Sequence, residues 1–416
     1  MFLNLLRRRN PGLLEVAARF HHAGEIPPNC YVIDLDAVGR NAVAIRVEAD
    51  RLGLKTFAMT KQVGRNRDMS DVLVRSGITH SVGVDLGCSL AAAAGGLRSG
   101  HVGHLVQIPH HQASIAASLE PLYWTVFNET KAQEAAEANA QLGRTQNLLA
   151  RVIGTDDIFY QGHEGGFAAQ DILAVADTLD ALDGARFSGI TTFPATLFDS
   201  ATNTVATTPN LETLRKAAAM LRKAGRSDVE VNAPGTTSTA LLSRLAEAGA
   251  TQIEPGHGLT GTTPWHAVED LVEDPAIAYI SEVSHLWNGS AYVFGGGLYV
   301  DPVLGEASTS AMIVTDPDSG IRDTRPLPVD MPAPGAIDYY ASIPLDNPRG
   351  VCVGNTVIFG FRAQVFVTRA HTVGISGLSV GMPRLHSLWM SDGSASLTHD
   401  GTVSAGSTAP GKEKAS

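Results

Sequence analysis

Short apolar segments alternate with helical stretches between residue 55 and about residue 255, and this alternation constrains the fold more than any other feature. The apolar segments are residues 55–60, 80–85, 104–108, 123–127, 148–153, 187–192, 229–233 and 251–255. Strands joined by helical crossovers pair in parallel. Eight such units predict a closed (β/α)₈ barrel, and an open doubly wound sheet fits the same alternation as the alternative.

Changes of pattern divide the chain into four parts. Residues after Pro264 form strand-like segments separated by Gly, Pro and Asp, which is typical of a mostly β domain. We predict a helical extension over 1–29 with a break at Asn10-Pro11, a barrel over 30–265 whose strand 30–36 could pack with the C-terminal domain, a β-rich domain over 266–404, and a disordered tail over 405–416.

Charge and apolar content exclude several classes of partner. The formal net charge is -11, so neither nucleic acid nor an anionic membrane surface is expected as a partner. No window of about 18 apolar residues is present, so no membrane span is expected. Three distant cysteines predict a reducing compartment, and the N-terminus places apolar residues before basic ones, the reverse of a signal peptide. We therefore expect a cytoplasmic protein.

The residues at the ends of the predicted strands form a specific set, because the C-terminal ends of the strands face the active site of such a barrel. Lys61 ends the first strand and has no acidic neighbour in sequence. The other strand ends carry Asp85, Gln107, Thr191–Phe193, the segment NAPGTTS (232–238) and the segment EPGHGLTG (254–261).

The last two segments have the composition of phosphate-binding loops. Gly235, Thr236 and Thr237 precede a predicted helix, whose N-terminus favours anions. Gly256 and His257 offer a second backbone cradle. Loops after strands seven and eight form the common phosphate site of these barrels.

A lysine, a phosphate site and the carboxylate Glu254 together suit one cofactor. Pyridoxal phosphate needs a lysine for a Schiff base, a phosphate site and a partner for its pyridine nitrogen. A desolvated pocket lowers the pKa of a lysine and makes it a better nucleophile. An unpaired Lys61 at a strand end fits that requirement.

Three segments resemble a known family. YVIDLDAV followed by FAMTKQ resembles the N-terminal barrel of the alanine racemase superfamily, the third fold type of pyridoxal-phosphate enzymes. IEPGHGLTG resembles its Arg-Pro-Gly phosphate segment with Glu in place of Arg, and it resembles even more the Glu-Pro-Gly-Arg segment of ornithine and diaminopimelate decarboxylases. The whole chain is most similar to the YhfX-type branch, a set of predicted amino-acid racemases.

The resemblance implies roles for matching residues. Lys61 would form the Schiff base and Glu254 would face the pyridine nitrogen, which favours a quinonoid carbanion. Phe193 falls where many relatives stack a histidine on the ring. The remaining cofactor-binding residues expected are Asn232, Gly235, Thr236, Thr237, Gly256 and His257.

The reaction that the resemblance implies is racemisation or epimerisation of an amino acid. Decarboxylation or a lyase reaction is the alternative, because Glu254 suits those as well, but the Cys-Glu-Ser segment of the decarboxylases has no match. A non-catalytic role in pyridoxal phosphate homeostasis is a further alternative, although such relatives lack a second domain. The His-x-Cys pair of metal-dependent relatives is also missing, and His101 and His104 lack a visible third ligand, so no metal is expected.

A racemase needs a second acid/base, which in alanine racemases is a tyrosine of the partner subunit. Here Phe359 stands at that place. Candidates for the second acid/base are Tyr299, Cys352, Tyr339 and Tyr340, and Arg362 is a candidate for binding a substrate carboxylate. The family resemblance implies a homodimer with shared active sites.

Overall fold

Eight parallel strands form a barrel in the computed structural model, which describes residues 1–299, 308–318, 321, 324–333 and 335–396. The strand order is β2-β12-β11-β8-β6-β5-β4-β3, and a parallel bridge between Ala58 and Ser81 joins the two end strands. This closure confirms the barrel and excludes the open sheet. The strands are β2 (Lys55–Thr56), β3 (His80–Val82), β4 (Arg98–Val102), β5 (Tyr123–Val126), β6 (Gln146–Ile153), β8 (Ala185–Thr191), β11 (Glu230–Asn232) and β12 (Gln252–Ile253).

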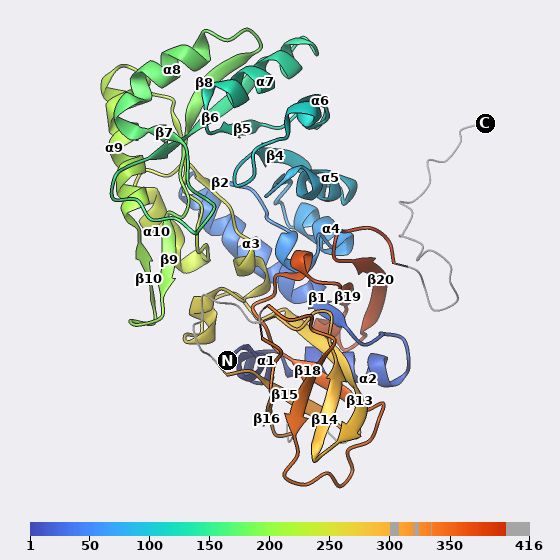
Figure 1. Ribbon diagram of the computed structural model, residues 1–416. Coiled ribbons are helices and arrows are strands. Elements are labelled where there is room, and N and C mark those ends of the chain that lie inside the picture. The colour runs from blue at the N-terminus through green and yellow to red at the C-terminus, as the bar shows by residue number, and fades with distance from the viewer. Residues whose placement is uncertain (300–307, 319–320, 322–323, 334, 397–416) are drawn as a thin grey trace, which may run out of the picture.

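Helices surround the barrel, and each of them follows a barrel strand in sequence except α3, which precedes β2 (Figure 1). Asp34, Asn66, Asp85 and Asn128 each cap a helix by accepting a hydrogen bond from a backbone N–H of its first turn. The helices are α3 (Leu35–Arg51), α4 (Arg67–Arg75), α5 (Leu86–Ala94), α6 (Ala113–Ser118), α7 (Glu129–Ala140), α8 (Ile172–Asp180), α9 (Pro209–Lys223) and α10 (Thr239–Glu247). Strand β7 (Phe167–Ala168) pairs with β6, and β9 (Thr196–Asp199) pairs with β10 (Thr204–Thr207).

The third barrel strand is not where the apolar pattern placed it. Residues 104–108 form no strand, and β4 (Arg98–Val102) pairs with β3 and β5 instead. The sequence of β4 is RSGHV, which lacks an apolar run. Gly100 lies against the ring of Phe57, and His101 is buried, so this strand is interior without being hydrophobic.

The second domain is built on another sheet, drawn in the lower part of Figure 1. Its strand order is β16-β15-β18-β13-β1-β19-β20, with β14 between β13 and β17. The predicted strand 30–36 is β1, and it lies inside this sheet between β13 and β19 rather than in the barrel. The strands are β1 (Cys30–Asp34), β13 (Ile277–Trp287), β14 (Ser290–Phe294), β15 (Ser310–Val314), β16 (Leu327–Pro328), β17 (Tyr340–Pro344), β18 (Thr356–Phe359), β19 (His371–Ser376) and β20 (Arg384–Met390).

Two N-terminal helices cover this second sheet. Helix α1 (Phe2–Arg9) and α2 (Pro11–His22) bury leucines against residues of β1, β13, β15 and β18. The expected break is present, and Asn10 caps α2 by accepting from the Leu13 N–H at 3.3 Å. The extension is therefore part of the C-terminal core.

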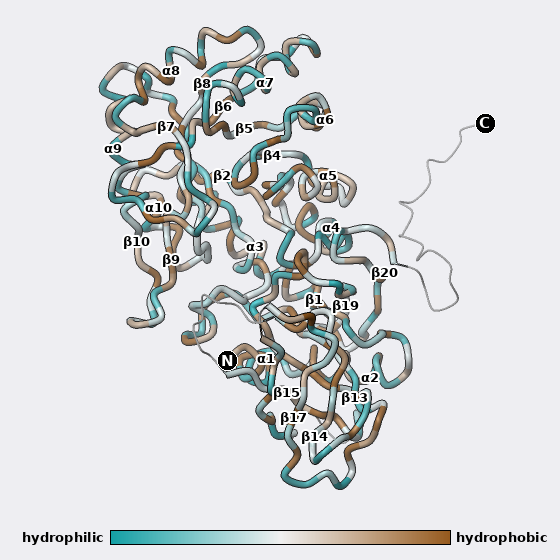
Figure 2. The backbone as a smooth tube through the Cα atoms, in the orientation of Figure 1, coloured by the Kyte–Doolittle hydropathy of each residue, from teal (hydrophilic) through white to brown (hydrophobic). Residues whose placement is uncertain are grey.

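Apolar residues are distributed in short segments throughout the described chain. Hydrophobic and hydrophilic residues alternate over short distances along the tube in Figure 2. Among the described residues, no helix combines the length and the hydropathy that crossing a bilayer requires. The predicted tail over 405–416 lies outside the described residues.

Candidate active site

A cavity of about 330 Å³ opens at the C-terminal ends of the barrel strands, against the second domain. Most residues that the sequence singled out line it. These are Lys61, Phe193, Gly235, Thr236, Thr237, Glu254, Gly256, His257, Tyr299 and Arg362.

Four other candidates do not line the cavity. Asn232 lies beneath it and donates to Glu254 Oε1 at 3.0 Å. Cys352 is exposed on the loop before β18, and Tyr339 and Tyr340 are exposed at the start of β17. Of the four candidates for a second acid/base, Tyr299 is therefore the one that lines the cavity among the described residues.

Lys61 lies at the first position of a short 3₁₀ turn (Lys61–Val63) that follows β2. Its Nζ lies 4.8 Å from the centroid of the Phe366 ring, which belongs to the second domain. Burial lowers the pKa of Lys61, and the charges of Arg362 and Arg65 act in the same direction. These effects outweigh nearby acidic groups, so the amine loses its proton more easily than an exposed lysine.

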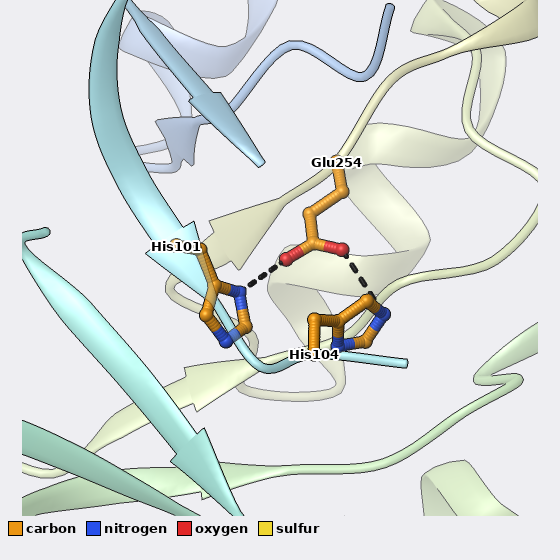
Figure 3. A group of neighbouring side chains, drawn as sticks. All are labelled: His101, His104 and Glu254. Carbon is orange, nitrogen blue, oxygen red and sulfur yellow. Dashed lines mark hydrogen bonds and ion pairs between the residues drawn. The ribbon is translucent and has the colours of Figure 1, made fainter. Parts of the chain in front are cut away.

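Glu254 is held by two histidines that meet it inside the barrel (Figure 3). His101 Nδ1 lies 2.6 Å from Glu254 Oε1, and His104 Nε2 lies 3.2 Å from Oε2. Nε2 of His101 lies 2.6 Å from the hydroxyl of Thr125. All four side chains are buried. We call Thr125, His101, Glu254 and His104 the carboxylate network.

Glu254 is ionised in this network. Burial raises the pKa of its carboxyl, but His104, His101 and the hydrogen bonds from His101 and Asn232 outweigh burial, so the net pKa is lowered. Burial lowers the pKa of His104 to about 3, so this ring is neutral near pH 7. An ionised carboxylate only accepts hydrogen bonds, so His101 Nδ1 carries the proton.

No sequence pattern indicated this arrangement. His101 and His104 have no visible third ligand near them in sequence, but Glu254 is that third group, 153 residues after His101. Their ligand atoms lie within 4.8 Å of one another, which also suits a metal ion. The absence of a metal stays a prediction, and this group is the place to test it.

The loops after β11 and β12 could bind an anion, but the backbone N–H of Thr236 does not contribute as the sequence predicted. A Cβ at Gly235 would lie 2.6 Å from the backbone Thr196 O, so this position requires glycine, whereas a Cβ at Gly256 would meet only the end of the Gln62 side chain, which can move. Ser238 Oγ, before α10, is buried without a hydrogen-bond partner. However, the backbone N–H of Thr236 already donates to Thr196 O, so it is not free for phosphate.

Unsatisfied polar atoms lie around the cavity as well. Glu254 Oε2 and Gln62 Oε1 are buried without a hydrogen-bond partner, since His104 is within reach of Oε2 but not aligned. Buried polar atoms in native proteins are nearly always paired, so these atoms are suited to contact a bound ligand. A ring N–H beside Glu254 and an anion beside the glycine loops would fit, as pyridoxal phosphate requires.

An aromatic wall faces the carboxylate network. Phe193 contacts His104 edge to face, with ring centroids 5.9 Å apart. Tyr160 and His163 pack on Phe193 at 5.8 Å and 6.1 Å, and both line the cavity. They come from the polar, Gly-rich loop between β6 and β7, whose sequence contains no signal that points to a site.

The second domain completes the cavity over the barrel mouth. Arg362, Gln364 and Tyr299 line it from that side. Gln364 Nε2 lies 3.3 Å from His257 Nε2. Burial, with the charges of Arg362 and Lys61, holds the pKa of His257 well below its usual value, so this ring is neutral.

Two family models match the chain. A model described as the N-terminal domain of alanine racemase matches residues 33–264, and one described as a YhfX-like C-terminal domain matches residues 278–385. The protein of Escherichia coli strain K12 called "Uncharacterized protein YhfX" is 37% identical over 385 residues, which cover 92% of this chain and 97% of that protein.

Solved structures of low identity share the fold. A D-threo-3-hydroxyaspartate dehydratase from Delftia sp. HT23 has a TM-score of 0.63 at 17% identity, covering 86% of this chain and 97% of its own. A D-threonine aldolase from Filomicrobium marinum has a TM-score of 0.61 at 15% identity, covering 88% and 96%. An alanine racemase of Clostridium difficile 630 has a TM-score of 0.60 at 13% identity, covering 88% and 99%.

Proposed function

Because the chain belongs to the family defined by the alanine racemase N-terminal domain, we propose that it acts at the α-carbon of an amino acid as a racemase or epimerase. Members of this fold family depend on pyridoxal phosphate, as the sequence predicted for this chain. The solved structures with this fold include a racemase, an aldolase and a dehydratase. The fold is therefore compatible with several reaction types, and racemisation or epimerisation is our proposal.

One observation carries the proposal. The amine of the half-buried Lys61, the glycine loops at 235 and 256, and the carboxylate of Glu254 all line a single cavity. Lys61 would hold the cofactor's aldehyde, the loops its phosphate, and Glu254 its ring nitrogen. Bound pyridoxal phosphate supplies an electron sink that weakens the bonds at the α-carbon of an amino acid.

The residues of the chain supply the proton chemistry and the orientation. Lys61 has a lowered pKa, so its neutral amine can accept the α-proton of one enantiomer. Glu254 has a lowered pKa, so it stays ionised at neutral pH and would accept a hydrogen bond from a protonated ring nitrogen. Arg362 lines the same cavity and offers a guanidinium to the substrate carboxylate.

Absorbance and product analysis test the proposal. The purified protein should show a cofactor band outside the protein's own absorbance, and Lys61→Ala should abolish it. Incubation with single L-amino acids should yield the D-enantiomer of at least one without loss of total amino acid. Absence of the band after reconstitution with pyridoxal phosphate, or its persistence in Lys61→Ala, would refute the site.

A lyase or a decarboxylase on the same site is the second candidate. It is supported by the carboxylate at position 254, because a protonated ring nitrogen also favours these reactions. Release of ammonia, an aldehyde or carbon dioxide would identify it, whereas a racemase conserves the amino acid. A protein that binds the cofactor but changes no amino acid in the panel would support the homeostasis alternative.

We further propose that the protein works in the cytoplasm as a homodimer. Cys30, Cys88 and Cys352 are all free thiols, which suits a reducing compartment. The family resemblance supports a dimer with shared sites. Light scattering of the purified protein measures the mass, and a monomer at micromolar concentration would contradict the dimer.

A further inference from the structure

Interconversion of two enantiomers requires proton-transfer groups on both sides of the α-carbon. Lys61 supplies one of them in the proposed function. Phe359, which stands where the resemblance places a tyrosine, has an exposed fraction of 0% and stacks on Phe361 in the core of the second domain. The residue for the other side must therefore be sought elsewhere.

The order of strands around the barrel identifies the loop that lies opposite Lys61. Lys61 follows β2, and in the closed order β2-β12-β11-β8-β6-β5-β4-β3 the strand β6 is four steps from β2 in either direction. The loop that follows β6 thus enters the cavity from the wall opposite Lys61. That loop carries His163, which lines the cavity.

The other two histidines that line the cavity, His104 and His257, already contact polar side chains of the protein. His104 lies against Glu254, and its pKa of about 3 keeps it neutral. His257 lies 3.2 Å from the Thr262 hydroxyl and 3.3 Å from Gln364, and its pKa is well below the usual value. By contrast, His163 is only half-buried, and its Nδ1 is a buried atom without a hydrogen-bond partner.

The position of His163 is set by its surroundings. Its ring packs against Phe193 and Tyr160 on the aromatic wall. Its backbone carbonyl accepts a hydrogen bond from the buried Arg151 Nη2 at 2.6 Å. Arg151 also lies over the ring of Phe127, at 4.6 Å. The loop is thereby tied to the barrel interior, so the imidazole is held at the cavity.

Nearby charges favour the neutral ring. Burial lowers the pKa of His163, the positive charges of Arg151 and Lys61 lower it further, and Glu164 opposes them. A neutral imidazole near pH 7 can accept a proton, and the imidazolium can return it.

We infer that His163 is the second acid/base of the proposed racemase, acting across the cavity from Lys61. In one direction the imidazole takes the α-proton, the bonding electrons stay with the substrate, and the ammonium of Lys61 delivers a proton to the opposite side. His163 then carries one proton more and Lys61 one fewer, and turnover in the reverse direction or exchange with water restores both. This inference rests on the proposed function.

Exchange in heavy water separates the two groups. Each enantiomer of the substrate found in the panel is incubated with enzyme in ²H₂O, and deuterium at the α-carbon is followed by mass spectrometry. His163→Asn should slow exchange of one enantiomer by about a hundredfold or more, because a general base contributes at least that much. Exchange of the other enantiomer, served by Lys61, should change by less than about fivefold.

Tyr299→Phe is the competing variant and His111→Asn, an exposed histidine outside the cavity, is the matched control. One-handed loss in Tyr299→Phe and not in His163→Asn would assign the role to Tyr299 and overturn the inference. Equal loss of both enantiomers in a His163→Asn protein that keeps its cofactor band would also overturn it. A wild-type enzyme that exchanges neither enantiomer would refute the proposed function itself.

A second measurement needs no turnover. Nuclear magnetic resonance of ¹³C-labelled histidine in the cofactor-free protein, assigned with His163→Asn, gives the pKa of His163. It should lie below 6.5 and rise in Lys61→Met, because that variant removes a positive charge that lowers it. An unchanged titration in Lys61→Met would show that the two groups do not share the cavity's field, and it would overturn the inference.

Discussion

The two ends of the cavity handle charge in opposite ways. Around Glu254 the barrel builds a fully buried network, in which the carboxylate accepts hydrogen bonds from His101 and Asn232 and lies 3.2 Å from His104. Around Lys61 the described residues provide the face of Phe366 and two arginines whose charges oppose its protonation. One end keeps its charge in place, and the other makes a proton easy to lose. A cofactor that needs a constant ring partner and a reactive amine suits this difference.

Removing the reactive amine of Lys61 should cause the largest loss of activity. Lys61→Arg keeps a positive charge, but a guanidinium stays protonated and cannot act as an amine nucleophile. We expect loss of the cofactor band and a fall in kcat of about 10³-fold or more. Absorbance spectra and steady-state assays measure both effects. Near-normal activity would mean that another group holds the cofactor.

Neutralising the other end should have a smaller effect. Glu254→Gln keeps the shape and one hydrogen-bonding oxygen but removes the charge. Because the amide cannot stabilise a protonated ring nitrogen as a carboxylate does, we expect kcat to fall by about 10²-fold with the cofactor still bound. Steady-state assays and the cofactor band measure this. An unchanged kcat would show that Glu254 does not face the ring.

The contribution of His101, which orients Glu254, can be measured as a change in the free energy of unfolding. His101→Leu removes the donor to Oε1 and leaves a buried acceptor with fewer partners, which costs roughly 1–3 kcal/mol. Urea unfolding of the cofactor-free protein measures the change, with His111→Leu as the exposed control. A loss equal to that of the control would show that the network contributes little to folding.

The pH dependence of stability should follow the buried His104. Its folded pKa of about 3 lies below its usual value of 6.5, so the unfolded chain binds the proton more tightly. Stability is therefore greatest above about pH 6.5 and falls as the pH drops towards 3. Glu254, with its folded pKa below 4.5, adds to the loss at the acidic end. His104→Gln should flatten the slope between pH 6.5 and 4.5, as urea unfolding at each pH can show.

Chelation should have the smallest effect. Because Glu254 already accepts hydrogen bonds from His101 and Asn232, we expect the network to work without a metal ion. Treatment with a chelator should change activity by less than about twofold. Elemental analysis of the purified protein is the check. One equivalent of a transition metal that disappears in His104→Gln would instead make the carboxylate network a metal site.

Local patterns predicted much of this molecule because they depend on neighbouring residues. The strand–helix alternation and the Asn10-Pro11 break both act within a few positions. The third strand was not predicted because strands were expected where apolar residues occur in a run, and RSGHV buries mostly small and polar side chains. The sequence placed strand β1 in the barrel part but allowed it to pack with the C-terminal domain, where its partners β13 and β19 lie far along the chain.

Strand periodicity and glycine's missing side chain are properties of short segments, so the sequence predicted the strand–helix repeat, Lys61 and the glycine loops, but it left the closed barrel and the open sheet as alternatives. Only the tertiary structure decided which groups meet. Barrel closure brings His101 to Glu254 across 153 positions and places His163 opposite Lys61. Such contacts depend on the order of strands around the ring, which no local pattern contains.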